Sequence, residues 1–233
     1  MKKLAKLTTA VIMLLFAFSW TSVQGQTELK RKEQQVTFTG GDVSVLKNEK
    51  YFMVLLKVDA MKMGNNNDSV PVYEKKKVEE LNSRASGKGD YWLRKWEFDQ
   101  TCFLTEFICG FNDMASGSMI LKPDTVVNGE AKPAFIMVLT PSQLFDYVDV
   151  CHLLMHLKIA TVSNPEKAVA EFDFVTAYSK FYDRGDKLDC HKRSAPGTFY
   201  ESGEMLGRYF NKYLYKSKNK PAATVKNDDW TVN

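Results

Sequence analysis

The hydrophobic residues of this chain first gather in a short run near its start. Residues 10–18 are all apolar, and three lysines stand among the first six residues. The run is shorter than the ~20 apolar residues that a bilayer-spanning helix needs. Val23 and Gly25 then fit the small-residue pattern of a cleavage site. The pattern predicts a signal peptide over residues 1–25 and a mature chain from Gln26, with an uncleaved membrane anchor as the alternative.

Later apolar residues follow the spacing of strands. Residues 51–58 form a nearly continuous apolar run, whose length and composition predict a strand buried on both faces. Four further runs are rich in β-branched and aromatic residues and also predict strands. They cover residues 118–122, 134–139, 154–162 and 168–178.

The last two of these strands predict a hairpin with one buried face and one solvent face. Residues 164–167 have the composition of a turn. A four-residue loop there places apolar residues opposite apolar ones and a lysine opposite an acid. His156 falls on the solvent face. The expected pairs are Ile159 with Phe172, Leu157 with Phe174, and, on the solvent face, Lys158 with Asp173.

Two regions show the three- and four-residue spacing of helices. In the first region, residues 74–84 predict a short charged helix that Ser86–Gly89 ends. Asp99 can then cap a second helix over residues 100–112. The apolar stripe of this second helix predicts a core position for its side chains. The stripe comprises Phe103, Leu104, Phe107, Ile108 and Phe111.

The second helical region lies near the end of the chain. Thr198 and Glu201 have the spacing of a capping box, which predicts a helix start at Thr198. Pro221 is expected to end this helix. Its apolar stripe comprises Met205, Leu206, Tyr209, Phe210, Tyr213 and Leu214.

The order of strand, helices, four strands and helix predicts an α+β fold, with a mixed α/β fold as the alternative. We expect a single two-layer domain in which a mostly antiparallel sheet packs with two main helical regions. Its expected limits are residues 36–216. A flexible N-terminal segment at 26–35 precedes the domain, and a disordered tail at 217–233 follows it.

Removal of the signal peptide leaves 208 of the 233 residues and changes the charge. The whole chain has 32 basic and 28 acidic residues, and three of the basic residues lie in the signal peptide. The mature chain therefore has 29 basic and 28 acidic residues, a net charge of +1. This balance gives no electrostatic reason to expect a nucleic-acid partner.

Composition also bears on the compartment. The hydrophobic content of 44% is typical of a folded globule, and no second apolar run is long enough to predict a transmembrane span. No cysteine directly follows the apolar run of the signal peptide. We therefore expect an exported protein, periplasmic or extracellular, that is not a lipoprotein.

Four cysteines, Cys102, Cys109, Cys151 and Cys190, raise the question of disulfides. An exported protein can form them. Cys102 and Cys109 would lie about 10 Å apart along one helix, whereas a disulfide needs Cα atoms within about 7 Å. Any bridge therefore joins one of these two cysteines to Cys151 or Cys190. Four buried thiols are the alternative.

No nucleophile elbow, P-loop, zincin helix or dinucleotide fingerprint occurs in the sequence. Metal-capable residues gather in one region but lack the paired spacing of zinc ligands, so we expect no metal and no cofactor. Catalytic residues stay unknown, because 28 acidic residues single out no pair. The metal-capable residues are Asp149, Cys151, His152 and His156, with Cys190 and His191 farther along.

Several short motifs resemble a group of uncharacterised exported proteins of Gram-negative gut commensals, over roughly Val36 to Lys216. These motifs are turns, core aromatic residues and a closing helix, and the resemblance implies no catalytic residues. The order of elements is also loosely similar to periplasmic α/β domains of envelope-assembly proteins, namely the curli secretion protein and the penicillin-binding-protein activators. The motifs are Val36–Asp42, Ser44–Lys47, Asp90-Tyr91, Trp96, Phe107, Phe111-Asn112, Met155–Ile159 and Leu206-Gly207-Arg208.

Export, the absence of catalytic motifs and the many aromatic residues favour a non-enzymatic envelope or secreted module. We expect it to bind a protein or polymer partner through an exposed apolar or aromatic patch on the sheet or at a helix edge. An extracytoplasmic hydrolase with a carboxylate or Cys–His site is the alternative, and metal or haem scavenging is a third hypothesis.

Overall fold

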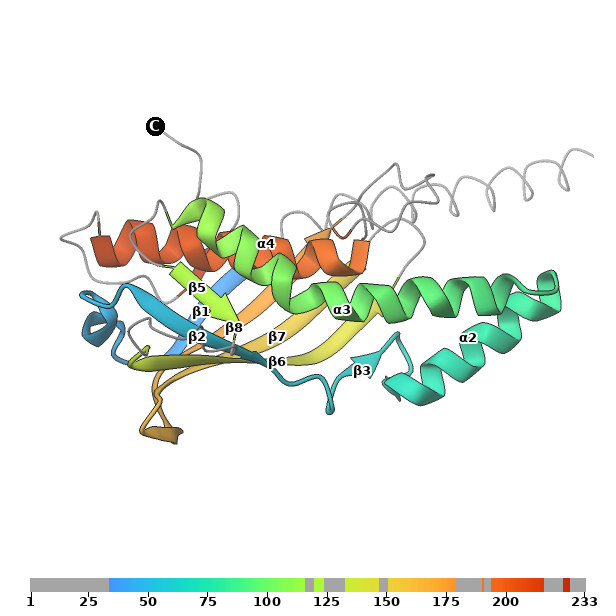
Figure 1. Cartoon of the computed structure of the whole chain (residues 1–233), viewed down its shortest axis with the longest axis horizontal. Coiled ribbons are helices and arrows are strands. Elements are labelled where there is room, and N and C mark those ends of the chain that lie inside the picture. The colour runs from blue at the N-terminus through green and yellow to red at the C-terminus, as the bar shows by residue number, and fades with distance from the viewer. Residues whose placement is uncertain are drawn as a thin grey trace, which may run out of the picture.

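The computed structural model describes residues 34–115, 120–123, 133–146, 151–178, 190, 194–215 and 224–226. In this part of the chain, one mixed β-sheet packs against helices that lie on one of its faces (Figure 1). The predicted α+β class is confirmed, and so is the mainly antiparallel character of the central strands. The predicted signal peptide lies outside the described residues.

The described strands form a nine-stranded sheet in the order β4-β3-β6-β7-β8-β1-β9, with β2 and β5 joined to it through β6. The pairs β6–β7, β7–β8, β8–β1 and β1–β9 are antiparallel, whereas β2 is parallel to both β5 and β6, and β3 is parallel to β6. The strands are β1 (Gln35–Gly41), β2 (Tyr51–Leu56), β3 (Lys62–Met63), β4 (Asp68–Ser69), β5 (Ile120–Pro123), β6 (Phe135–Asp146), β7 (Cys151–Thr161), β8 (Asn164–Tyr178) and β9 (Thr224–Lys226).

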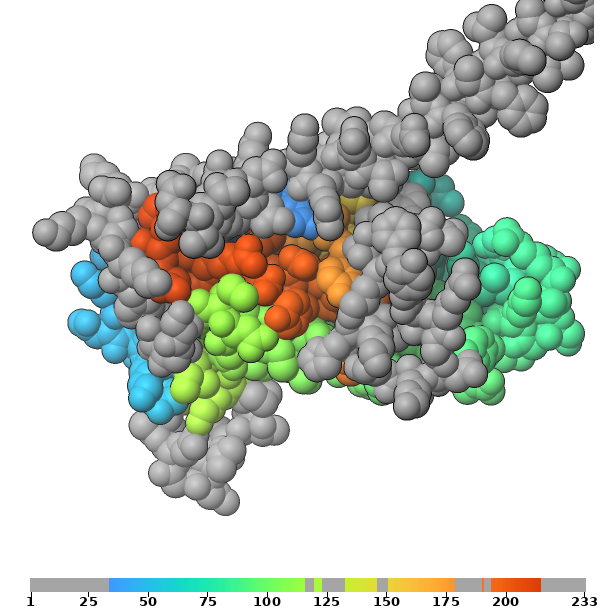
Figure 2. All heavy atoms as spheres, turned by 90° about the horizontal axis from the view of Figure 1, so that it is seen from above, coloured from blue at the N-terminus to red at the C-terminus, as the bar shows by residue number. Residues whose placement is uncertain are grey.

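Two long helices cover one face of the sheet, and a third projects from it. Helices α3 (Lys88–Met114) and α4 (Ser194–Phe210) lie side by side over the strands (Figure 1). Helix α2 (Val70–Arg84) pairs with the first half of α3 and forms a separate lobe with it (Figure 2). A 3₁₀-helix η1 (Val43–Leu46) follows β1, and a π-helical turn η3 (Asn211–Tyr215) follows α4. None of the described helices combines the length and hydrophobicity needed to cross a bilayer.

Helix α3 is continuous, so the prediction of a helix that starts after Asp99 is wrong. Asp99 lies inside α3 and is only 5% exposed. Trp92 and Trp96 extend the stripe of Phe103 and Phe107 at helical spacing, and their rings stack with centroids 6.1 Å apart. One helix can therefore place all four aromatic rings on the same face, which favours continuity over a break.

The predicted capping box at Thr198 is also wrong, because α4 starts at Ser194. Thr198 is fully buried, and its hydroxyl donates a hydrogen bond to the carbonyl of Ala195 at 2.7 Å. Pro196 lies in the first turn, where a missing N–H removes no helical hydrogen bond. The apolar stripe of this helix is confirmed: Met205, Leu206, Tyr209, Phe210 and Leu214 are buried, and Tyr213 packs against them.

The predicted β7–β8 hairpin has the correct faces but the wrong register. Leu157 pairs with Phe172, and Lys158 pairs with Glu171 rather than Asp173. The turn is at Val162-Ser163, and two register shifts near Ala160 take up the extra residues of β8. The error is two residues, an even number, so each side chain keeps its predicted face.

Described strands reach into both segments that the sequence placed outside the domain. Strand β1 begins at Gln35, one residue before the expected start, and Gln34 is already buried. At the other end, β9 lies within the predicted disordered tail and pairs with Gln35–Thr37. A sheet edge with unpaired backbone groups favours such pairing. The sequence pattern of three residues could not predict β9, because its partner is about 190 positions away along the chain.

Glycine at position 41 is required by both conformation and space. Gly41 has φ +89°, and a Cβ there would lie 2.1 Å from the carbonyl oxygen of Val169. That oxygen already accepts a hydrogen bond from the Asp42 N–H at 2.7 Å. Gly87 has a similar φ of +78° but nothing within 4 Å of a Cβ.

We therefore expect Gly41→Ala to lower the free energy of unfolding by about 1–3 kcal/mol more than Gly87→Ala does. Both substitutions carry the strain of a left-handed backbone, but only Gly41→Ala also pushes β1 away from β8. Urea unfolding of the two variants measures the difference. Equal losses would mean that the contact with Val169 relaxes without cost.

Candidate functional site

One face of the central strands carries no described helix, and we call it the open face (Figure 1). It is formed by alternate residues of β6, β7 and β8, because successive side chains of a strand point to opposite faces. The intervening residues, such as Leu157 and Phe172, point toward α3 and α4 and are fully buried. The open face includes Val138, Thr140, Leu154, His156, Lys158, Glu171, Asp173 and Val175.

A short charged ladder crosses the open face from β7 to β8. The Nδ1 atom of His156 lies 2.8 Å from a carboxylate oxygen of Asp173, and its Nε2 lies 3.6 Å from Glu171. Lys158 lies opposite Glu171 on the neighbouring strands. The side chain of Asp173 is 57% exposed. The ladder therefore presents both signs of charge to solvent, and the prediction that His156 lies on the solvent face is confirmed.

An apolar cluster adjoins the charged ladder on the same face. Ile136, Val138 and Ala160 are buried against one another, and Met53 and Leu55 of β2 pack on them and stay half-exposed. The prediction that β2 is buried on both faces is therefore wrong, because Phe52 and Val54 are buried on one face while Met53 and Leu55 on the other stay half-exposed. Ile136, Val138 and Ala160 are at most 6% exposed, so only Met53 and Leu55 add apolar surface beside the charged ladder. This face can contact a partner through Met53, Leu55 and the charged ladder, and its pair of His156 with Asp173 is also capable of acid–base chemistry.

The metal-capable residues that the sequence singled out do not come together. Within the described part of the chain, no group of three or more His, Cys, Asp or Glu side chains could hold a metal ion. His156 points to the open face, whereas Cys151 is fully buried under the helices. His152 is half-buried on β7. Asp149 and His191 lie outside the described residues.

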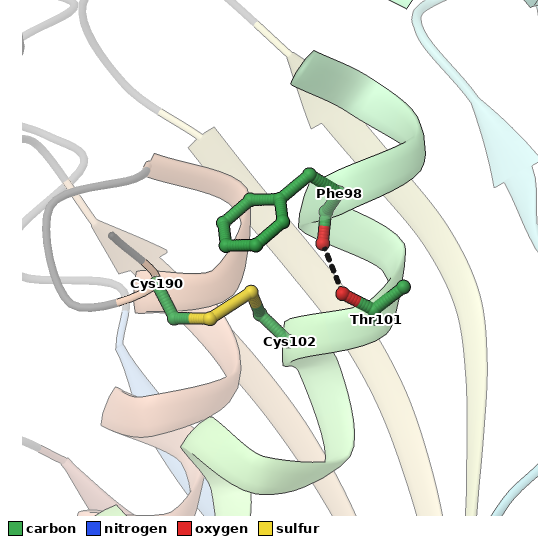
Figure 3. The surroundings of a disulfide bond; sticks show 4 residues. All are labelled: Phe98, Thr101, Cys102 and Cys190. Carbon is green, nitrogen blue, oxygen red and sulfur yellow. Dashed lines mark hydrogen bonds between the residues drawn. A yellow bond between two sulfur atoms is a disulfide. The ribbon is translucent and has the colours of Figure 1, made fainter. Parts of the chain in front are cut away.

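The cysteine pairing settles a question that the sequence left open. Cys102 of α3 is bonded to Cys190, with Cα atoms 5.6 Å apart (Figure 3). Beside this bond, the hydroxyl of Thr101 donates to the carbonyl of Phe98 at 2.7 Å. The exclusion of a Cys102–Cys109 bridge is therefore confirmed. Cys109 and Cys151 form no disulfide.

A cluster of acids lies where α3 meets α4. Tyr200 donates a hydrogen bond to Asp113 at 2.8 Å, and burial together with this bond raises the pKa of Tyr200. Burial also raises the pKa of the Cys109 thiol, with Glu106 and Asp113 adding to the effect. Both shifts favour the protonated forms of the phenol and the thiol at neutral pH.

Glu204, also in this cluster, has a raised pKa because of burial, which the Arg208 guanidinium 3.3 Å away only partly offsets. The folded state then binds a proton over a pH range in which the unfolded state does not, so its stability falls as pH rises from about 4.5 through that range. We expect Glu204→Gln to remove this decrease in the free energy of unfolding with rising pH. Unfolding in urea at pH 4 and pH 8 measures it, with Glu79→Gln on α2 as the exposed control. A wild-type protein whose pH dependence matches that of Glu204→Gln would contradict the expectation.

No family model matches this chain, and no curated protein matches it. Among solved structures, the chain is similar to two dodecamers of PelC from Paraburkholderia phytofirmans. A variant PelC gives a TM-score of 0.34 at 9% identity over 75% of this chain and 96% of that chain. PelC itself gives a TM-score of 0.31 at 10% identity over 74% of this chain and 94% of that chain. Similarity at this level supports no inference about function.

Proposed function

We propose that this protein is an exported, non-enzymatic module that binds a protein or polymer partner in the envelope or outside the cell. The observation that supports this function is the open face, where the half-exposed Met53 and Leu55 lie beside an exposed charged ladder. Mixed surfaces of this kind are typical of binding sites, because apolar burial supplies affinity and charges fix orientation.

The alternative is an extracytoplasmic hydrolase with a carboxylate or Cys–His site, and its Cys–His form finds no suitable nucleophile among the cysteines. Cys190 is held in the disulfide with Cys102 and has no thiolate to offer. Cys151 has no exposed surface, so a substrate cannot reach it. Cys109 is half-buried and its raised pKa keeps it as a thiol. The described cysteines therefore weigh against the Cys–His form of the alternative, and the carboxylate form is addressed by the hydrolysis test below.

The test is capture of a partner from envelope extract by the immobilised protein. We expect Asp173→Lys to reduce recovery at least tenfold, because it reverses the most exposed charge of the ladder beside His156. Glu79→Lys makes the same change of charge at an exposed position on α2 and is expected to recover the partner normally. Circular dichroism checks that both variants are folded.

Equal recovery by the two variants would show that the open face is not the binding surface. Hydrolysis of an envelope polymer by the purified wild-type protein, lost in neither variant, would instead favour the enzymatic alternative.

A further inference from the structure

Three neighbouring rows of the open face have a simple order across β7 and β8. In two of them a basic side chain on β7 lies opposite an acid on β8, and in the third two apolar side chains lie opposite each other. The basic groups of these rows therefore stand on one strand and the acids on the other. The rows are Lys158 with Glu171, His156 with Asp173, and Leu154 with Val175.

The charged side chains of these rows keep surface for a further contact. The side chain of Asp173 is 57% exposed, and those of His156 and Glu171 are 39% and 38% exposed. Lys158 is half-exposed beside them. The Nε2 atom of His156 lies 3.6 Å from Glu171, which is longer than a hydrogen bond. Glu171 can therefore accept a closer contact from a basic group of another molecule.

A second copy of the chain matches this order of charges. When it is rotated by half a turn about a line that runs along the strands between β7 and β8, its β7 lies over β8 of the first copy. This rotation leaves positions along the strands unchanged, so each row meets itself. Lys158 then faces Glu171 of the second copy, and His156 faces Asp173 of the second copy. Every contact occurs twice, as in any isologous interface.

The charges also disfavour the other way of stacking the two faces. Half a turn about a line across the strands would place β7 over β7 and β8 over β8. Lys158 would then meet a basic group, and Glu171 would meet an acid, which costs free energy. The ladder is therefore complementary to a second copy in one orientation.

The open face is also large enough for a specific dimer. Three strands lie on each side of the line between β7 and β8: β2, β6 and β7 on one side, and β8, β1 and β9 on the other. At the usual spacing of strands and rise per residue, these six strands and the 11 residues of β7 cover at most about 850 Å². Standard interfaces bury ~800 Å² on each partner. The apolar row of Leu154 and Val175 adds apolar contact next to the charged rows.

We propose that a second copy of this chain docks on the open face, with β7 of each copy over β8 of the other. This rests on the proposed function, since it uses the same face and names the occupant. Two sheets that pack face to face lie about 10 Å apart, with their strands within about 30° of each other. Long side chains such as Lys158 and Glu171 reach across this distance, so the charged rows fix the orientation of the pair.

The test reverses one charge at a time and then combines the two variants. Lys158→Glu places an acid over Glu171 of the second copy, and Glu171→Lys places a lysine over Lys158. We expect each variant alone to associate at least tenfold more weakly than the wild type. Mixed in equal amounts, the acidic face of one variant meets the basic face of the other, so the mixture should associate at least tenfold more tightly than either variant alone. Analytical ultracentrifugation with fluorescently labelled Lys158→Glu measures both effects.

Glu79→Lys on α2 is the matched control, because it makes the same change of charge as Glu171→Lys at an exposed position away from the open face. It should associate as the wild type does and should recruit labelled Lys158→Glu less than Glu171→Lys does. Circular dichroism checks that all three variants are folded.

A wild type that stays monomeric up to about 100 μM overturns the proposal. A dimer that both single variants keep, or a mixture that associates no better than either variant, also overturns it. If the wild type is monomeric while Asp173→Lys still loses the partner captured from envelope extract, the proposed function remains and this inference fails. If the mixture restores the dimer while Asp173→Lys captures envelope proteins as the wild type does, self-association remains and the envelope partner is lost.

Discussion

Replacing Gly203 with alanine is expected to lower the free energy of unfolding by about 3 kcal/mol. A Cβ at Gly203 would lie 2.1 Å from the carbonyl oxygen of Phe107 and 2.8 Å from the nitrogen of Phe111, both backbone atoms of α3. Gly110 of α3 makes the reciprocal approach, 2.1 Å from the carbonyl oxygen of Tyr200. Backbone cannot yield as a side chain can, so α3 and α4 must separate. Urea unfolding followed by circular dichroism measures the loss.

Separation of the two helices would also disturb the rings between them and the sheet. Phe103 and Phe199 stack across the two helices with centroids 4.3 Å apart. Phe172 of β8 meets Tyr209 of α4 edge to face at 5.2 Å. The attraction in these contacts falls steeply with distance. One added methyl group at position 203 therefore weakens packing in much of the core.

Gly207 provides the graded control for this prediction. A Cβ there would lie 2.7 Å from the carbonyl oxygen of Phe111 and 2.9 Å from the Cβ of Met114, so its closest approach is less severe than the 2.1 Å at Gly203. We expect Gly207→Ala to cost less than Gly203→Ala. Alanine is the better helix former by about 1 kcal/mol, so a Gly203→Ala variant as stable as the wild type would contradict the close approach.

Strand positions and core stripes could be predicted because each depends on residues that are close together in the sequence. Alternation along β7 and β8 placed His156 on the open face and Leu157 in the core, as the structure has them. The register between the two strands could not be predicted, because it depends on where bulges near Ala160 absorb extra residues. Such bulges carry no clear signal in a single sequence.

The ends of elements were the harder part of the prediction. Asp99 has the residue type of a cap, yet it lies buried inside α3, because tertiary packing of the aromatic stripe overrides a local capping preference. Strand β9 forms only because β1 offers it an edge. The candidate site follows the same rule: the polar side of the hairpin could be predicted, but the apolar cluster beside it required the pairing of β2 with β6.

Removal of the Cys102–Cys190 disulfide is expected to lower the free energy of unfolding by about 3–4 kcal/mol. The two cysteines are 88 positions apart, and a cross-link that closes a long loop restricts the unfolded chain strongly. The change is Cys102→Ala with Cys190→Ala, because Cys102 is 1% exposed and alanine leaves no polar group in its place. Urea unfolding with and without reductant is the measurement.

The response to reductant separates the cross-link from simple packing. Reductant should lower the urea midpoint of the wild type toward that of the Cys102→Ala/Cys190→Ala variant and should leave the variant unchanged. Cys109→Ala removes a half-buried cysteine of the same helix that forms no disulfide, so it should cost less and keep the full response to reductant. A wild-type midpoint that does not move with reductant would mean that the bond adds no stability. Because the same bond ties the centre of α3 to Cys190, four positions before α4 begins, its loss is expected to loosen the α3–α4 layer over the sheet and not only to relax the unfolded chain.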